Sequence, residues 1–178
     1  MDRTRRVEQH TWAGNSSSAW VSCAQNLIAA ATVLRERRDS IDSSSATAPT
    51  AFIHPVELML NCMAVEGLLK ALWVKQGNYL AKDGRYVAVC GAGGHDLVQL
   101  ADVLNLTLSE FEKDTLRRLS HFIEYGGRYP VPKDADKLQL TRAPNGGRAA
   151  ATTWCTPSDY AHLDAVVHRL NQLLGNEA

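Results

Sequence analysis

The segment from Val56 to Val74 is apolar almost all round a predicted helix, and it constrains the fold more than any other part of the chain. A helix with apolar residues on every side must be contacted from several directions, so we expect it to lie at the centre of a helical bundle. His54 and Pro55 predict its start, because proline in the first helical turn gives up no backbone hydrogen bond. Gly77 predicts a C-cap just beyond its end.

Periodic apolar residues and capping signals predict further helices around this one. An earlier helix follows the serines at 16–18 and extends to about Arg38, and its basic last turn is expected to be a solvated helix end. Three later helices are predicted from His95–Asp96 to about Leu104, from a capping box at 109–112 to about Tyr125, and from a cap at 156–159 toward the C-terminus. These signals favour an all-α fold, an up-and-down bundle of four to five helices.

The segments between these helices are predicted to be one hairpin or irregular chain. Residues 78–90 favour a short β-hairpin, with Asp83-Gly84 at its turn. We expect residues 1–15 to fray, 40–53 to form a serine- and alanine-rich linker, and 126–155 to form one long loop rich in glycine and proline. With 178 residues, the chain is expected to form a single domain.

Charge and cysteine content narrow the classes of function. The 19 lysines and arginines cancel the 19 aspartates and glutamates, so no global field attracts nucleic acid or an anionic membrane. The four cysteines form no Cys-x-x-Cys pair, and no histidine pair has the spacing of a metal site, so we expect no metal and no disulfide framework. Asp96 stands where a dinucleotide fingerprint needs glycine or alanine, and we expect no cofactor. No secretory signal or membrane span is predicted, which favours a reduced, cytoplasmic protein.

Glu66 and Lys70 are the polar pair in the apolar helix. They stand four residues apart in the orientation that favours an ion pair, with apolar neighbours on both sides. The pair either fixes helix register as a structural ion pair or belongs to a polar site. Because His95 and Asp96 open the next helix, we predict that these four residues lie in one polar cluster.

The run Ala64-Val-Glu66-Gly-Leu-Leu-Lys70-Ala-Leu, followed by Gly94-His95-Asp96-Leu97, resembles the HEPN superfamily of small prokaryotic helical bundles. Arg128-Tyr129-Pro130 resembles a segment in some uncharacterised branches of that superfamily, and the likeness covers roughly residues 55–130. The resemblance implies a four- to five-helix bundle that often dimerises. It also implies links to toxin–antitoxin, antiviral and stress systems, in which many members cut RNA without a metal.

The chain departs from the pattern of the active HEPN ribonucleases, which carry an arginine, four to six residues, and then a histidine. Arg117 and His121 have only three residues between them, and Arg128 has no histidine following within reach. We therefore expect a non-catalytic binding or regulatory module, homodimeric through its apolar helix stripes. Its further partner is expected to be RNA or a cognate protein, such as a nucleotidyltransferase or an antitoxin.

Two alternatives remain open at the level of sequence, and with them the question whether the protein is an enzyme. In one, the chain is a metal-independent RNA endonuclease with a variant site, in which His95 or His121 is the general base and Arg128 stabilises the phosphorane. In the other, it is a small-molecule or nucleotide-binding domain with the 126–155 loop as a lid. Glu66, Lys70, Asp96 and Tyr129 are the candidate binding residues. Arg128 and Tyr129 are expected to anchor the loop on the bundle, with Arg128 pairing with Glu66, Asp96 or a bound phosphate.

Overall fold

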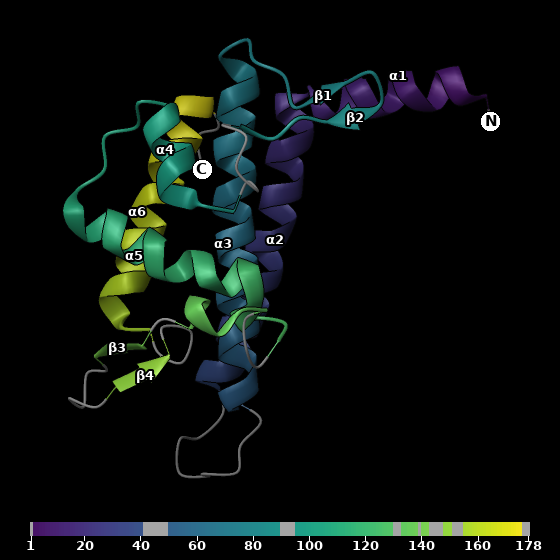
Figure 1. The fold of residues 1–178 in the computed structure, drawn as a ribbon. Coiled ribbons are helices and arrows are strands. Elements are labelled where there is room, and N and C mark those ends of the chain that lie inside the picture. Colours follow the sequence, from purple (N-terminus) through teal and green to yellow (C-terminus); the bar gives the residue numbers. More distant parts are fainter. Residues whose placement is uncertain are drawn as a thin grey trace.

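The computed structural model describes most of the chain, and these residues form a helical bundle (Figure 1). The described residues are 2–40, 50–89, 95–129, 133–138, 140–142, 148–150 and 155–175. Their helices are α1 (Arg3–Gly14), α2 (Ser17–Asp39), α3 (Thr50–Lys75), α4 (Leu97–Val103), α5 (Glu110–His121) and α6 (Pro157–Leu174). Their strands form two separate antiparallel hairpins, β1 (Ala81–Lys82) with β2 (Arg85–Tyr86) and β3 (Leu140–Arg142) with β4 (Arg148–Ala150). The predicted all-α bundle with a small hairpin is confirmed.

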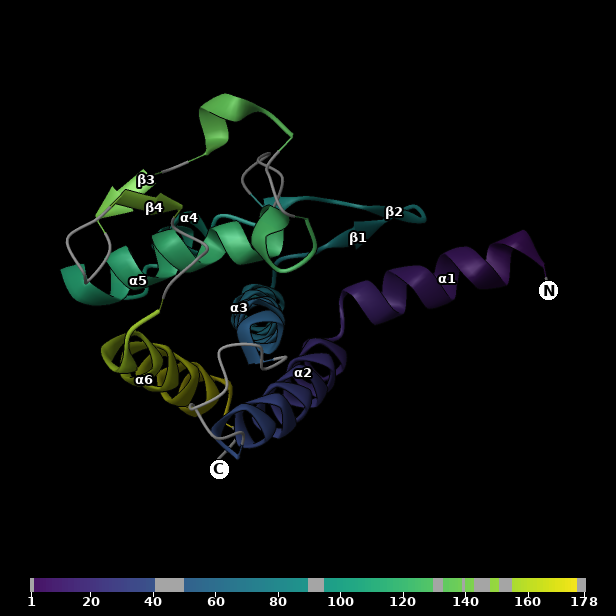
Figure 2. The ribbon, with the colours of Figure 1, turned by 90° about the horizontal axis from the view of Figure 1, so that it is seen from below.

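The helix α3 is the central element, as its all-round apolar sequence predicts. Figure 2 shows α3 end-on, with α2 and α6 on one side and α5 and the β1–β2 hairpin on the other. Every residue of α3 from Ala64 to Leu72 is buried, including Glu66 and Lys70. Despite this apolar character, none of the helices in the described part of the chain is long and apolar enough to span a bilayer.

The helix α2 runs antiparallel to α3 and packs closely against it. Near one end Ser17 donates a hydrogen bond to the carbonyl of Ala71, and near the other Arg35 binds Glu57. Gly67 permits the close approach between them, because a Cβ added there would lie 3.3 Å from the Cβ of Ala24. Small residues at the crossing thus let two long helices share a nearly continuous contact.

The helices α5 and α6 begin with capping boxes, as their sequences predict. Ser109 accepts a hydrogen bond from the backbone N–H of Glu112, whose carboxylate accepts from the backbone of Ser109. Thr156 and Asp159 make the same reciprocal pair at the start of α6. Each box satisfies backbone donors that a helix start leaves without an intrahelical partner.

The helix α5 ends earlier than predicted and continues as a π-helical turn. The turn spans Phe122–Gly126 and is closed by a hydrogen bond from the backbone N–H of Gly127 to the carbonyl of Phe122, 3.1 Å away. Gly127 lies against α3, where a Cβ would come within 2.4 Å of the Cβ of Met59. The absence of a side chain at Gly127 therefore lets the turn approach the central helix.

The β1–β2 hairpin has the predicted turn. Asp83 and Gly84 both have positive φ, at 50° and 72°. Two consecutive residues of that kind are typical of the tight turns that join antiparallel strands, and aspartate followed by glycine adopts them readily.

The expectation that residues 1–15 fray is wrong, because Arg3–Gly14 form α1. Asp2 caps this helix, which projects away from the bundle in both views (Figures 1 and 2). None of its residues is buried. The hairpin fixes its direction, since a Cβ on Gly14 would meet the Cβ of Ala81 at 2.5 Å and Gly84 lies close to Val7. The side chain of Asn15 completes this anchor.

Two other predicted boundaries differ from the structure. The helix α3 begins at Thr50, so residues 50–53 are helical and Pro55 lies inside the helix. The rest of the predicted linker, residues 41–49, lies outside the described residues. The predicted long loop holds a 3-10 turn at Ala135–Lys137 and the β3–β4 hairpin. Its remaining parts, 130–132, 139, 143–147 and 151–154, lie outside the described residues.

We predict that Asn15→Ala loosens α1 without unfolding the bundle. The Asn15 amide donates to the carbonyl of Ala81 (2.8 Å) and accepts from the backbone N–H groups of Leu80 (2.8 Å) and Ala81 (3.0 Å). Its loss leaves backbone groups without partners, at about 1–3 kcal/mol. Hydrogen exchange is expected to accelerate in α1 and the hairpin only. Gln76→Ala, the same truncation of an exposed amide, serves as the control, and unchanged exchange in α1 of Asn15→Ala contradicts the assignment.

Candidate functional site

The polar cluster predicted around Glu66 is present at the junction of α3 and α4. We define the Glu66 cluster as Glu66, Lys70, Tyr86 and His95. Glu66 and Lys70 form an ion pair within α3, and their side chains are only 9% and 8% exposed. The Nδ1 atom of His95 lies 2.9 Å from the second carboxylate oxygen of Glu66. Lys70 and His95 thus share one buried carboxylate, which confirms the prediction for these three residues.

The shared carboxylate fixes the orientation of the His95 ring. An ionised carboxylate only accepts hydrogen bonds, so Nδ1 of His95 carries the proton and donates it to Glu66. In the neutral form of the ring, Nε2 is then the acceptor. The His95 side chain is 47% exposed, whereas its partner is buried. The hydrogen bond to the buried carboxylate of Glu66 thus holds the half-exposed imidazole of His95 in a fixed orientation.

Aromatic rings enclose the charge of Lys70 on its other sides. Its Nζ lies 5.3 Å from the centroid of the Tyr86 ring and 5.4 Å from that of Trp20. Burial alone would lower the pKa of Lys70, but the hydrogen bond to Glu66, the charge of that carboxylate and Tyr86 together raise it. Lys70 therefore stays charged, and the cluster combines a buried ion pair with the exposed surfaces of Tyr86 and His95.

Asp96 does not join this cluster by any hydrogen bond or ion pair within the described part of the chain. Its carboxylate accepts a hydrogen bond from the backbone N–H of Gln99, 2.9 Å away, and so caps the start of α4. This is the structural role that its place at a helix start favours, since a carboxylate suits the positive end of a helix.

His121 faces the protein interior instead of an open site. Its side chain is 12% exposed, and neither ring nitrogen has a hydrogen-bond partner in the described structure. The Nδ1 atom of His121 lies 3.7 Å from the carboxylate of Glu124, and the His121 ring lies 6.0 Å from that of Tyr125. A general base must reach a substrate proton. Among the described residues, no hydrogen bond or ion pair connects His121 to the Glu66 cluster.

The prediction that Arg128 pairs with Glu66 or Asp96 is wrong. Its guanidinium donates to the carbonyls of Ile123 (2.7 Å) and Glu124 (3.3 Å), in the turn that ends its own helix. Tyr129 is 56% exposed, and its ring lies 5.5 Å from that guanidinium. Arg128 thus holds the chain after α5 against the end of that helix, while the ring of Tyr129 remains more than half exposed.

A second buried carboxylate, which the sequence analysis did not single out as a site, lies on the opposite side of α3. We define the Glu57 cluster as Glu57 with Arg35, Arg38, His54 and Tyr160. The Glu57 side chain is fully buried, and it binds Nε of Arg35 at 3.0 Å and Nη1 of Arg38 at 2.5 Å. The expectation of a solvated end for α2 is therefore wrong for these two arginines. The available signal was a glutamate with no cation near it in its own apolar helix, because such a charge requires a counter-charge from elsewhere.

The Glu57 cluster continues from α2 and α3 to α6. Nη1 of Arg38 donates to the hydroxyl of Tyr160 (2.6 Å), which lies 3.1 Å from Nδ1 of His54. Burial, reinforced by the charge of Arg38, lowers the pKa of His54. Burial and the charge of Glu57 raise the pKa of Tyr160. With His54 neutral and accepting at Nδ1, Tyr160 can donate to it while the Tyr160 hydroxyl oxygen accepts from Arg38. These bonds form a structural network across three helices.

A third buried carboxylate joins α6 to α5. Asp159 binds Arg118 and accepts a hydrogen bond from Thr115 at 3.2 Å. Burial would raise the pKa of Asp159, but hydrogen bonds from Arg118 and Thr156 lower it. Since the same carboxylate also closes the α6 capping box, it serves the packing of two helices and leaves little capacity for a ligand.

The described residues contain no group of three or more histidine, cysteine, aspartate or glutamate side chains that could hold a metal ion. Burial raises the pKa of the Cys62 thiol, and it raises that of Cys155 to about 12. Both thiols are therefore protonated at neutral pH and are poor nucleophiles and ligands. At the Glu66 cluster, the groups available for chemistry are the exposed side chains of His95 and Tyr86 and the buried Glu66–Lys70 ion pair.

Comparison of the chain with protein-family models, curated proteins and solved structures found no match. Its function is therefore inferred from its own residues and their arrangement.

We predict that Glu57→Gln destabilises the protein strongly. The change removes the charge that Arg35 and Arg38 share, and breaking a buried ion pair by losing one partner costs about 3 kcal/mol, at the lower end of the usual range because both arginines remain partly hydrated. Chemical denaturation measures the loss. Glu110→Gln, at an exposed position of α5, is expected to stay within about 0.5 kcal/mol of the wild type. Equal effects of the two substitutions would contradict a structural role for Glu57.

We predict that His54 makes the fold less stable below its ordinary pKa of 6.5. In that range an unfolded chain binds a proton at His54, whereas the folded protein, with its lowered pKa, does not. Protons therefore favour unfolding, and the free energy of unfolding falls as the pH is lowered from 6.5 toward the folded-state pKa. Denaturation at about pH 7.5 and about pH 5.5 is expected to show a smaller fall for His54→Gln than for the wild type. The exposed-site control, His168→Gln, should retain the full dependence, and the same fall in His54→Gln would refute the assignment.

Proposed function

We propose that this chain is a HEPN-like helical domain that acts as a non-catalytic binding or regulatory module in a prokaryotic toxin–antitoxin, antiviral or stress system. Three features support the proposal: the all-α bundle, the helix with Glu66 and Lys70 at its centre, and the histidine that meets them from the start of α4. These are the features in which the sequence resembles the HEPN superfamily.

The non-catalytic part of the proposal rests on one observation: the three candidate catalytic side chains are each held by different neighbours. His95 is fixed by Glu66, the ring of His121 is directed into the protein, and Arg128 is held by backbone carbonyls of its own turn. Metal-free RNA cleavage needs a base and a cation directed at one phosphate. Among the described residues, no interaction brings these three side chains to a common point.

The module is proposed to act as a homodimer and to engage RNA or a cognate protein. The half-exposed ring of His95 and the exposed ring of Tyr86, which lie against Glu66 and Lys70 respectively, are the parts of the Glu66 cluster that such a partner contacts. The buried Glu66–Lys70 pair beneath then serves as a rigid support, because its position is fixed by helix packing.

The alternative, a metal-independent RNA endonuclease, gains support from one detail. The bond from Nδ1 of His95 to Glu66 leaves Nε2 as an acceptor on a partly exposed ring, which is the arrangement of a histidine general base oriented by a carboxylate. The second alternative, a small-molecule or nucleotide site under a lid, involves the 126–155 segment, which the structure describes only in part.

A cleavage assay on labelled single-stranded RNA separates these functions. We predict that the wild type leaves the RNA intact over long incubation, both with and without a chelator. Fluorescence anisotropy measures the binding of the uncleaved RNA. We expect His95→Ala to bind this RNA at least tenfold more weakly than the wild type, a loss of about 1.4 kcal/mol. Arg128→Ala should lower the melting temperature and leave RNA binding unchanged.

His168→Ala, a truncation of an exposed histidine on α6, controls for the loss of an imidazole alone. RNA cleavage that disappears in His95→Ala and persists in His168→Ala would overturn the non-catalytic proposal in favour of the endonuclease. If the wild type does not bind RNA, the cognate partner is a protein and the endonuclease alternative is rejected.

A further inference from the structure

The connection between α4 and α5 alternates leucines with polar residues. Its sequence, Leu104-Asn-Leu-Thr-Leu-Ser109, repeats every second residue. Burial follows the same alternation, because Leu104 and Leu108 are buried whereas Asn105 and Thr107 are exposed. A period of two indicates a segment with one side against the protein and the other toward solvent. The leucines therefore face the neighbouring helices, and the polar residues form an edge.

These leucines form one wall of a hollow of about 730 Å³. The other walls come from the C-terminal ends of α3 and α6 and from the first turn of α5. We define the leucine hollow by its apolar lining, which consists of Leu72, Leu104, Leu106, Leu108 and Leu173. Its size lies within the range of roughly 300–1,000 Å³ that small-molecule sites occupy, and such sites commonly lie between the helices of a bundle. No residue of the Glu66 cluster lines it.

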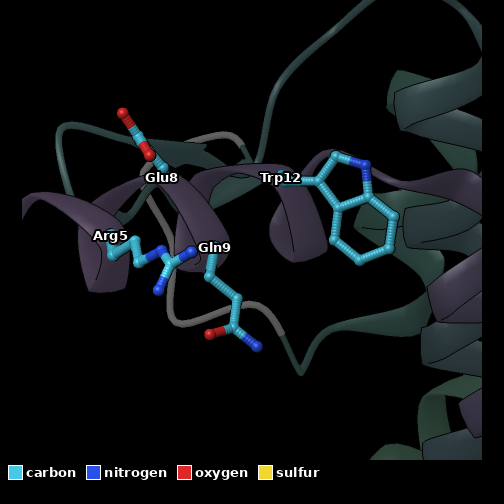
Figure 3. A pocket seen from close by; sticks show the side chains of 4 residues that line it. All are labelled: Arg5, Glu8, Gln9 and Trp12. Atoms are coloured by element: carbon cyan, nitrogen blue, oxygen red, sulfur yellow. The ribbon is translucent and has the colours of Figure 1, made fainter. Parts of the chain in front are cut away.

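A second hollow, of about 510 Å³, lies along α1 and differs in its construction (Figure 3). Its lining side chains, those of Arg5, Glu8, Gln9 and Trp12, all belong to that one exposed helix. One face of a single helix cannot enclose a ligand. The leucine hollow instead has walls from four segments, and the apolar side chain of Leu173 is 47% exposed at its edge. A ligand there would remove apolar surface from water, which favours binding.

The charges that line the leucine hollow cancel. Arg169 donates from Nη1 to the carbonyl of Thr107 at 2.5 Å and from Nη2 to Oε1 of Glu112 at 2.6 Å. The second carboxylate oxygen of Glu112 accepts from the backbone N–H of Ser109 at 2.7 Å. Burial would raise the pKa of Glu112, but the hydrogen bonds from Ser109 and Arg169 lower it, so the carboxylate stays ionised. A ligand with an anionic group would meet this carboxylate, and one with a cationic group would meet Arg169.

Hydrogen-bonding capacity remains at Arg169. Its guanidinium has five N–H groups, of which the two bonds above use two, and its side chain is 35% exposed. Gln76 and Thr107, which are polar and uncharged, also line the hollow. An uncharged oxygen of a ligand, as in an amide or an alcohol, is therefore matched here without a second charge. Among the described residues, no aromatic side chain lines the hollow, so a planar ring such as a nucleobase has nothing to stack on.

We propose that the leucine hollow binds a small uncharged molecule with an aliphatic body and one amide or hydroxyl head group. The body lies against the leucines, where each methylene removed from water favours binding. The oxygen of the head group accepts a hydrogen bond from Arg169. Binding here does not depend on the function proposed above, because the hollow shares no residue with the Glu66 cluster.

Titration with three eight-carbon probes, followed by nuclear magnetic resonance, tests the class of ligand. Octanamide is expected to give saturable shifts of the backbone amides at residues 104–109 and 169–174. Octanoate and octylamine carry the same tail with a charged head group, and we expect each to bind roughly tenfold more weakly because its charge is poorly matched. Hexanamide should also bind roughly tenfold more weakly than octanamide, since it buries two fewer methylenes. Octanamide without saturable shifts would overturn the site, and equal affinities of the three eight-carbon probes would overturn the uncharged class of ligand.

The variant Leu173→Gln tests the location. It replaces an exposed apolar side chain at the edge of the hollow with a polar one and keeps a good helix former, so the fold should be unchanged. Octanamide is expected to bind this variant roughly fivefold more weakly than the wild type. Val33→Gln, at an exposed apolar position of α2, is the matched control and should bind like the wild type. Unchanged affinity in Leu173→Gln, or an equal loss in Val33→Gln, would overturn the placement. His95→Ala should bind octanamide normally, which keeps this result separate from the RNA assays.

Discussion

Two buried carboxylates on α3 organise the bundle. Glu57 and Glu66 lie on different sides of an otherwise apolar helix, and neither could remain ionised there without a cation or donor supplied by the surrounding chain. Glu57 obtains two arginines from α2, one of which also bonds Tyr160 of α6. Glu66 obtains His95 from the start of α4 in addition to Lys70 of its own helix. Hydrophobic contact holds the helices together, and the two acids select which neighbours face which side of α3.

Sequence reasoning succeeded where the determinants were local. The central helix follows from its apolar composition, the starts of α5 and α6 from capping boxes spanning four residues, and the hairpin turn from Asp83 and Gly84. The Glu66–Lys70 pair is local as well, since both residues belong to one helix. The approach of His95 could be predicted because a half-paired acid in an apolar helix needs a partner at the next polar helix start.

The failures concern contacts between distant parts of the chain. The helix α1 depends on Gly14 and Asn15 contacting a hairpin more than sixty residues away, which no pattern in its own sequence indicates. In the sequence, Arg35 and Arg38 look like the arginines of an ordinary solvated helix end. Only the fold brings the carboxylate of Glu57 against them. Glu66 and Asp96 were wrong as predicted partners of Arg128, because the π-helical turn before that residue brings its guanidinium onto the carbonyls of Ile123 and Glu124. Tertiary placement, and not propensity, decided each of these positions.

Because of the π-helical turn, the surface that the chain presents after α5 depends on the number of residues in that turn. A turn closed five residues back instead of four contains one more residue than the regular helix, and each helical residue rotates the chain beyond it by about 100°. The extra residue therefore sets the phase at which the chain leaves α5, turning the bare backbone of Gly127 toward Met59 and the Arg128 guanidinium back onto the carbonyls it caps. A relative of this chain shortened by one residue between Phe122 and Gly126 would present a different side of residues 127–129 to α3. Insertions and deletions at this point would thus exchange one surface for another while leaving the helices before it in place.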